Sequence, residues 1–159
     1  MPLKLVHYPD PALLEACSEV AVFDEALDKE LEEMKTLMIE SKGIGLAANQ
    51  CGLNKAMFIM SSKGTVYEFI NPKFVSTPAG HQLMEEGCLS LPGVLVTIER
   101  AAEVVVEAQN KKGEKFEVVA TGLEAVCIQH EMEHLRGKFF LDSAPRQQRR
   151  AAIKKLGLK

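Results

Sequence analysis

Two histidines four residues apart, His130 and His134, constrain the fold more than any other feature of the chain, and Glu131 directly follows the first. On an α-helix, residues at this spacing share one face, and the spacing is that of metal ligands. Residues 123–129 lead into the pair with apolar positions at steps of three and four. This pattern predicts a helix whose histidines face the protein interior. The predicted interior stripe comprises Leu123, Val126, Cys127, His130 and His134.

The histidine pair alone leaves two interpretations open. A buried imidazole without a polar partner is unfavourable by roughly a few kcal/mol, so both rings need partners. A divalent metal bound between His130 and His134 would satisfy both rings, but hydrogen bonds to backbone carbonyl groups would do so too. A His-Glu-x-x-His pattern also arises by chance in charged helices. A third metal ligand elsewhere in the chain is needed to decide.

Length and composition indicate an ordinary globular protein. A chain of 159 residues is long enough to bury a substantial core, and 47% of its residues are hydrophobic and 26% charged. No apolar run approaches the roughly 20 residues of a membrane span, so we expect no membrane association. The four cysteines are well separated and form no C-x-x-C pair, which favours free thiols in a reducing cytoplasm. An organellar or virus-encoded origin stays open.

Charge is distributed unevenly along the chain. The residues after Asp142 carry six lysines and arginines and no acid, whereas the rest has 13 basic and 22 acidic residues, or −9. An acidic main part argues against direct DNA binding. We therefore predict one domain over residues 1–143, followed by a basic C-terminal helix or tail over residues 144–159.

Helical and strand signals predict an α+β fold. Asp24 is placed to cap a helix that runs to about Ser41, and Gly43 stands where a C-terminal cap is expected. Pro145 precedes a short last helix from Arg146 to about Leu156. Short apolar or alternating runs predict strands, and the turn at 110–113 predicts an antiparallel hairpin. These runs cover residues 56–60, 66–70, 94–98, 103–108 and 116–121. We expect curved antiparallel β-sheets packed around a central helix that carries the histidine pair.

The segment 43–50, with the sequence GIGLAANQ, allows a ligand or a neighbouring backbone to come close. Its glycines and alanines are small, and Gln50 places one amide side chain at its end. The segment has no G-K-[ST] sequence and is therefore no phosphate loop. A tight turn before a strand is the structural alternative.

A candidate third ligand lies in the segment 86–92, which we predict to be a turn. Gly87 frees the backbone, Pro92 fixes the exit, and Cys88 supplies a thiolate. A set of one cysteine and two histidines with one open position is a catalytic arrangement, because a structural zinc site would take a fourth protein ligand. Cys127 is interpreted as a small core or pocket-lining residue.

Three segments together resemble the signature motifs of the peptide deformylases. They are GIGLAANQ at 43–50, EGCLS at 86–90 and QHEMEHLRG at 129–137, in the order in which that family has them. The opening positions His7, Pro9, Asp10 and Leu13 are also similar to that family. The similarity extends to about Asp142.

This resemblance implies a hydrolase that removes the formyl group from the N-terminal formylmethionine of newly made polypeptides. It implies that Cys88, His130 and His134 bind one divalent metal, with water in the fourth position. Fe²⁺ is the metal expected in the cell, and Zn²⁺, Ni²⁺ or Co²⁺ are alternatives in a purified sample. Glu131 would act as general base and acid, and Gln50 and the backbone N–H of Leu89 would stabilise the oxyanion.

The resemblance also implies how the peptide substrate binds. The methionine side chain would enter a pocket lined by Ile44, Leu123, Val126 and Cys127 and by the face of His130. The backbones of Ile44, Gly45 and Gly87 would pair with the extended peptide as an added strand. Broad tolerance of the residues after methionine would follow.

The sequence departs from the family pattern at three places. Glu133 stands where an aspartate is usual, and its extra methylene group could disturb a contact with Arg100. Leu95 stands where many bacterial members have an arginine near the peptide. Residues 144–159 are fewer than in many bacterial members, whose last helix can dock on the ribosome, so ribosome contact is a further hypothesis.

Two other functions stay open from the sequence. One is another metallopeptidase or amidase of the His-Glu-x-x-His kind, which would usually take a third ligand downstream. The other is an inactive relative that keeps the metal for structure alone. Glu131 and Gln50 favour an enzyme, because a structural site needs neither residue.

Overall fold

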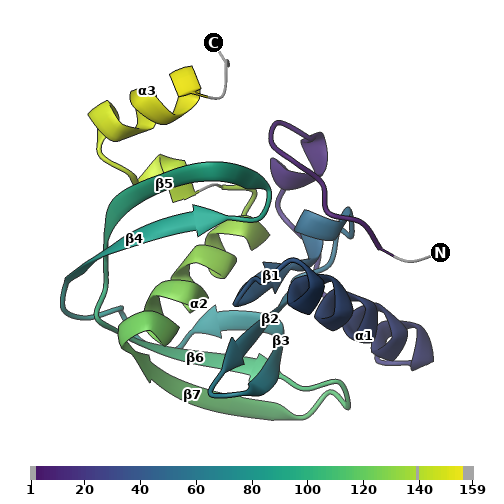
Figure 1. Cartoon of the computed structure of the whole chain (residues 1–159). Coiled ribbons are helices and arrows are strands. Elements are labelled where there is room, and N and C mark those ends of the chain that lie inside the picture. Colours follow the sequence, from purple (N-terminus) through teal and green to yellow (C-terminus); the bar gives the residue numbers. More distant parts are fainter. Residues whose placement is uncertain (1–2, 139, 156–159) are drawn as a thin grey trace.

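The computed structural model describes residues 3–138 and 140–155, which form an α+β fold (Figure 1). The helices of this part are α1 (Glu25–Glu40), α2 (Gly122–Leu135) and α3 (Arg146–Lys155), with 3-10 turns η1 (Pro11–Leu13), η2 (Ala48–Cys51) and η3 (Phe140–Ser143). The strands are β1 (Gly45–Ala47), β2 (Met57–Ser62), β3 (Thr65–Phe74), β4 (Gln82–Cys88), β5 (Leu91–Arg100), β6 (Glu103–Gln109) and β7 (Lys115–Thr121).

The strands form two antiparallel sheets with α2 between them. One sheet has five strands in the order β1-β2-β3-β6-β7, and the other consists of β4 and β5. Figure 1 shows the β4–β5 hairpin arching over α2 on the side opposite the larger sheet. The predicted α+β fold, with curved sheets around the histidine-bearing helix, is confirmed.

The central position of α2 explains its composition. Ten of its 14 residues are buried, so it lacks the polar outer face of a surface helix. Ala125, Ile128, Met132 and Leu135 pack in one cluster with the inner face of the larger sheet. The histidine pair is therefore held on a helix fixed by apolar contacts.

The helix α1 packs on the large sheet beside β1 and β2. The Asp24 carboxylate accepts a hydrogen bond of 3.1 Å from the Leu27 N–H, as expected of the cap. The prediction that Gly43 caps the other end is wrong by one residue, because Lys42 takes the left-handed conformation with φ of 59°. The Gly43 N–H then donates to the Met38 carbonyl at 2.9 Å, so Gly43 follows the left-handed residue in a Schellman arrangement.

The five predicted strands and the predicted hairpin between β6 and β7 are all present. The turn predicted over residues 86–92 is wrong. There β4 continues to Cys88, residues 89–90 make the turn, and Cys88 pairs with Leu91 at the start of β5. A shift in register between Glu86 and Cys88 replaces the expected break at Gly87, which places Cys88 at the end of a strand facing α2.

The helix α3 packs along β5, at the edge of the β4–β5 sheet. Ala144 and Ala152 pack with Leu91, Val94, Val96 and Ile98 of β5 in one cluster. Gln148 adds a polar contact, because its side-chain oxygen accepts a hydrogen bond of 2.9 Å from the Thr97 N–H. Leu156, where we expected this helix to end, lies outside the described residues. The division of the chain after residue 143 stays a prediction.

Within residues 3–138 and 140–155, none of the helices combines the length and the hydrophobicity that a membrane span requires.

Candidate active site

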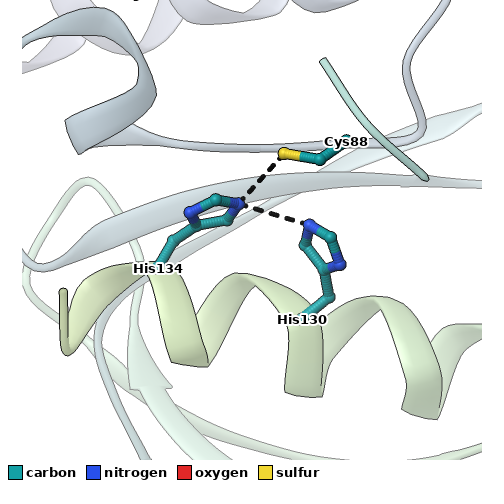
Figure 2. Close-up of side chains that lie close together, drawn as sticks. All are labelled: Cys88, His130 and His134. Atoms are coloured by element: carbon teal, nitrogen blue, oxygen red, sulfur yellow. Dashed lines mark hydrogen bonds between the residues drawn. The ribbon is translucent and has the colours of Figure 1, made fainter. Parts of the chain in front are cut away.

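The end of β4 and the middle of α2 bring three metal-ligating side chains together: Cys88, His130 and His134, called here the metal triad (Figure 2). The His134 Nε2 atom lies 3.3 Å from the Cys88 Sγ atom and 3.2 Å from the His130 Nε2 atom. All three ligand atoms lie within 4.8 Å of one another. Figure 2 shows the side chains pointing toward one common point from two different elements.

The metal triad fits a divalent metal in spacing and in donor chemistry. With metal–nitrogen distances of about 2.0–2.1 Å and a metal–sulfur distance of about 2.3 Å, tetrahedral ligands lie roughly 3.3–3.6 Å apart. The two contacts of His134, at 3.3 and 3.2 Å, are close to that spacing. One thiolate and two imidazoles suit zinc and iron alike. His134 is fully buried, and burial is the first cause that moves its pKa well below the ordinary value. Its ring therefore favours the neutral form that a metal ligand requires.

A buried carboxylate orients the first histidine. Glu86 Oε1 lies 3.0 Å from His130 Nδ1. The other ring nitrogen of His130, Nε2, then faces His134 of the metal triad. Arg100 donates two hydrogen bonds of 2.7 and 2.8 Å to Glu86. Burial alone would raise the pKa of Glu86, but the hydrogen bonds from Arg100 and His130 outweigh it and lower the pKa. Glu86 is thus a charged acceptor that holds His130 in one orientation.

Glu133 extends this network on the same helix. Its Oε1 atom forms an ion pair of 2.8 Å with Arg100 Nη1, and its Oε2 atom accepts a hydrogen bond of 2.5 Å from the Ser143 hydroxyl. The contact expected between Glu133 and Arg100 is therefore made, and the extra methylene group of Glu133 does not break it.

Glu131 is buried beside the metal triad with its carboxylate against the backbone of the 43–50 segment. A Cβ atom on Gly45 would lie 2.6 Å from Glu131 Oε2 and 2.8 Å from Cys127 Sγ, so any side chain at position 45 would displace one of them. Burial raises the pKa of Glu131 to about 7. A carboxyl group with that pKa can both take up and release a proton near neutral pH.

Gln50 presents its amide group to the same place. The Ala47 N–H donates a hydrogen bond of 2.9 Å to Gln50 Oε1, which leaves the NH₂ group facing Ser90 Oγ at 3.2 Å and Cys88 Sγ at 3.4 Å. The hydrogen bond to Ala47 thus fixes which end of the amide faces the metal triad.

A cavity of about 530 Å³ joins these groups. Every residue for which the sequence predicted a role in substrate binding or catalysis lines it, and so do two residues of the metal triad. These lining residues are Ile44, Gly45, Gln50, Gly87, Cys88, Leu89, Leu123, Val126, Cys127, His130 and Glu131. His134 is fully buried behind the others.

The chain is similar in sequence and in fold to known peptide deformylases. The sequence profile of the polypeptide deformylase family matches residues 2–150. A peptide deformylase of Chromobacterium violaceum is 43% identical over 92% of this chain and 90% of its own length. The chain belongs to the peptide deformylase family. A deformylase of this family depends on a metal and acts on formylated peptides, and the metal triad is a group of side chains that could hold such an ion.

Solved structures of the family agree. A peptide deformylase from Legionella pneumophila has a TM-score of 0.92 and 36% identity over 99% of this chain and 94% of its own. One from Synechococcus elongatus in complex with actinonin has a TM-score of 0.94 and 35% identity over 99% of this chain and 89% of its own.

The structure corrects one position of the predicted stripe and adds residues that the sequence did not reveal. Leu123 does not face the interior as predicted: its side chain is exposed, and it lines the deformylase cavity. Glu86 was missed as the partner of His130, although a strand over 86–88 would have placed its side chain on the same side as Cys88. Asn49 was missed too, and its side-chain NH₂ donates to the His134 carbonyl at 2.5 Å. No local pattern pointed to that contact.

Proposed function

We propose that this deformylase removes the formyl group from the N-terminal formylmethionine of newly made polypeptides. The observation that carries the proposal is the convergence of the metal triad with Glu131 and Gln50 on one cavity. A purely structural metal site would need neither a buried carboxylate with a raised pKa nor an oriented amide. A cytoplasmic location, where formylated peptides are made, fits this substrate.

The proton-transfer role falls to Glu131. A divalent metal bound to the triad supplies Lewis acidity, which polarises a carbonyl oxygen and acidifies water. Glu131 takes a proton from the attacking water and passes it to the leaving amine, which becomes the free N-terminus. A pKa of about 7, raised by burial, suits a group that must act first as base and then as acid.

Gln50 and Leu89 stabilise the negative charge that develops on the formyl oxygen. The Gln50 amide is held with its donor end toward Cys88, and Leu89 lines the cavity directly after that residue. Donors fixed before the reaction need no reorganisation, and removal of one such donor lowers turnover by about 10²–10³-fold in other enzymes.

The buried end of the cavity takes the methionine side chain. Val126, Cys127 and His130 line it and are nearly inaccessible to solvent, as an apolar side-chain pocket requires. The peptide backbone adds to β1, which is one of the two edge strands of its sheet. The Ile44 carbonyl, for which pairing with the peptide was predicted, already accepts a hydrogen bond from the Ser61 N–H. The alternation along a strand then directs the Gly45 backbone toward the peptide.

The metal of the active enzyme is proposed to be Fe²⁺, with Zn²⁺, Ni²⁺ or Co²⁺ taking its place in purified samples. The donor set alone does not select among them, because availability and geometry decide occupancy. Metal analysis of protein purified without oxygen, alongside activity, tests the assignment. Zinc with full activity and no iron would overturn it.

Formate release from formyl-Met-Ala-Ser tests the function. Protein loaded with Fe²⁺ or Ni²⁺ should release formate and leave the Met-Ala bond intact. Cys88→Ala should bind less metal and release little formate. Cleavage within the peptide without formate release would instead favour a peptidase. Metal binding without either reaction would favour an inactive relative.

Ribosome contact through α3 is a further part of the proposal. Arg146 and Arg150 are exposed on this helix, and exposed cations favour the phosphate backbone of RNA. The double variant Arg146→Glu/Arg150→Glu should co-sediment less with ribosomes, while its formate release from a tripeptide stays unchanged. Equal co-sedimentation of the two proteins would overturn this contact.

A further inference from the structure

Three large apolar side chains stand half exposed around the opening of the active-site cavity. They belong to Ile44, Leu95 and Leu123, which are 49%, 63% and 55% exposed and all line the cavity. They come from three separate segments, namely the residue before β1, the outer face of β5 and the first turn of α2. We call them the apolar rim. Exposed apolar groups gathered around a binding cavity are typical of a contact surface.

The Leu95 side chain lies next to Gly87, at the cavity, where a bound peptide would contact it. A Cβ atom on Gly87 would lie 2.8 Å from Leu95 Cδ2, so the Leu95 side chain already covers the backbone of Gly87. Gly87 directly precedes the metal ligand candidate Cys88 and lies on the arch that β4 and β5 form over α2 (Figure 1). A peptide that pairs with Gly87 therefore runs against Leu95.

The charges near the cavity leave the rim apolar. Glu86 and Glu131 line the cavity but are buried, and Glu86 is paired with Arg100. Lys42 also lines the cavity but is exposed. An ion pair between Lys42 and an acidic group of a substrate would therefore add little to binding. The rim thus offers a ligand mainly apolar surface.

We propose that Leu95 is a specificity-determining residue that favours substrates with a large apolar side chain at the second or third position, after formylmethionine. The inference rests on the proposed function and narrows the broad tolerance expected there. The cavity, at about 530 Å³, lies within the range that takes drug-sized ligands, so it has room for a second side chain. Partial burial of a leucine on the rim should raise kcat/KM about fivefold to tenfold.

Three peptides measure the preference: formyl-Met-Leu-Ser, formyl-Met-Ser-Leu and formyl-Met-Ser-Ser. In the wild-type enzyme, at least one leucine peptide should exceed the third peptide about fivefold or more in kcat/KM. Leu95→Thr, which keeps a residue suited to a strand, should reduce that ratio to about twofold or less. Equal ratios in wild type and Leu95→Thr would overturn the proposal.

Leu83→Thr is the matched control. Leu83 is 70% exposed on β4 of the same hairpin, and it is not among the residues that line the cavity. Its replacement removes the same apolar group from the same sheet and should leave the ratio between the peptides unchanged. A change as large as that in Leu95→Thr would show a general effect on the hairpin and overturn the role of Leu95.

Binding separates this inference from the proposed function. Dissociation constants of the three peptides are measured by calorimetry for Glu131→Gln with and without Leu95→Thr. A leucine preference that disappears with Leu95→Thr supports the rim, even if the wild-type enzyme releases no formate and the proposed function fails. If all three peptides release formate at equal rates and bind equally well, the proposed function holds and the specificity role of Leu95 is overturned.

Discussion

The helices α1 and α2 both pack apolar side chains against the large sheet, but only α2 also buries charged and polar side chains. In α1, the buried residues are Leu27, Leu31, Met34 and Met38, and acids and lysines occupy the outer face. In α2, the buried residues include His130, Glu131, Glu133 and His134. The contrast shows that α1 buries only apolar side chains and keeps its ion pairs, such as Lys35 with Glu68, at partly exposed positions, whereas α2 places charged and polar groups where water cannot reach them.

Buried charge of this kind is a poor source of stability. A buried ion pair replaced by apolar side chains often leaves a protein as stable or more stable, whereas removal of one partner is strongly destabilising. Glu86, Arg100 and Glu133 form such a set, and Glu86 connects it to His130 of the metal triad. The polar residues of α2 are therefore best explained by the chemistry of the site. Four substitutions test this contrast.

Glu131→Gln should separate function from stability most clearly. Turnover of formyl-Met-Ala-Ser should fall by roughly 10²–10⁴-fold, because general acid–base catalysis is lost. The melting temperature should stay equal or rise, since a buried carboxylate is removed. Metal content serves as the control and should match the wild type. Wild-type turnover would refute the assigned role.

Arg100→Met should destabilise the α2 region strongly. Its buried guanidinium contacts Glu86 and Glu133, and removal of one partner from a buried charge set costs about 3–5 kcal/mol. Urea denaturation measures the free energy of unfolding. Arg100→Lys should lose less stability than Arg100→Met, because a cation remains. It should still be less stable than the wild type, because lysine cannot make the two-pronged contact with Glu86. A loss under about 1 kcal/mol in Arg100→Met would show that Arg100 does not hold its contacts with Glu86 and Glu133 in solution.

Leu31→Ala should destabilise α1 without touching the chemistry. Leu31 is fully buried against the sheet, and leucine-to-alanine changes in cores cost about 2–5 kcal/mol. The rate of formate release per folded molecule should equal that of the wild type at a temperature well below the melting transition. A fall in that rate would mean that α1 and the active site are coupled, contrary to the comparison.

Asp24→Ala should have the smallest effect of the four. The Asp24 carboxylate accepts the Leu27 N–H at the start of α1, and loss of such a cap costs about 1 kcal/mol. A thermal melt detects the difference, and Asp24→Ser should restore most of the stability. If both variants melt with the wild type, this cap contributes nothing measurable.

Local signals in the sequence predicted α1, α2 and five of the strands, because each has a clear period and defined ends. The strands β1 and β4 were not predicted. β1 has three residues, too few for a period, and β4 is interrupted by a register shift next to Gly87. Their place follows from pairing with distant strands, which no local pattern encodes.

The candidate site shows the same limit. The metal triad and Glu131 belong to motifs and could be predicted, but the contacts that orient them join distant elements. Glu86 meets His130 across 44 positions of the chain, and Asn49 meets the His134 carbonyl across 85. Leu123 was misplaced because helical periodicity gives the face of a residue and not whether another element covers it.

The packing of α3 has a consequence for how the protein behaves in solution. This helix closes over the apolar side chains of β5, and Gln148 occupies the Thr97 N–H on that strand. A chain cut after Asp142 would expose an apolar strand with a free backbone donor, which is a template for association between copies. We therefore expect residues 144–155 to keep copies of the protein from associating through β5.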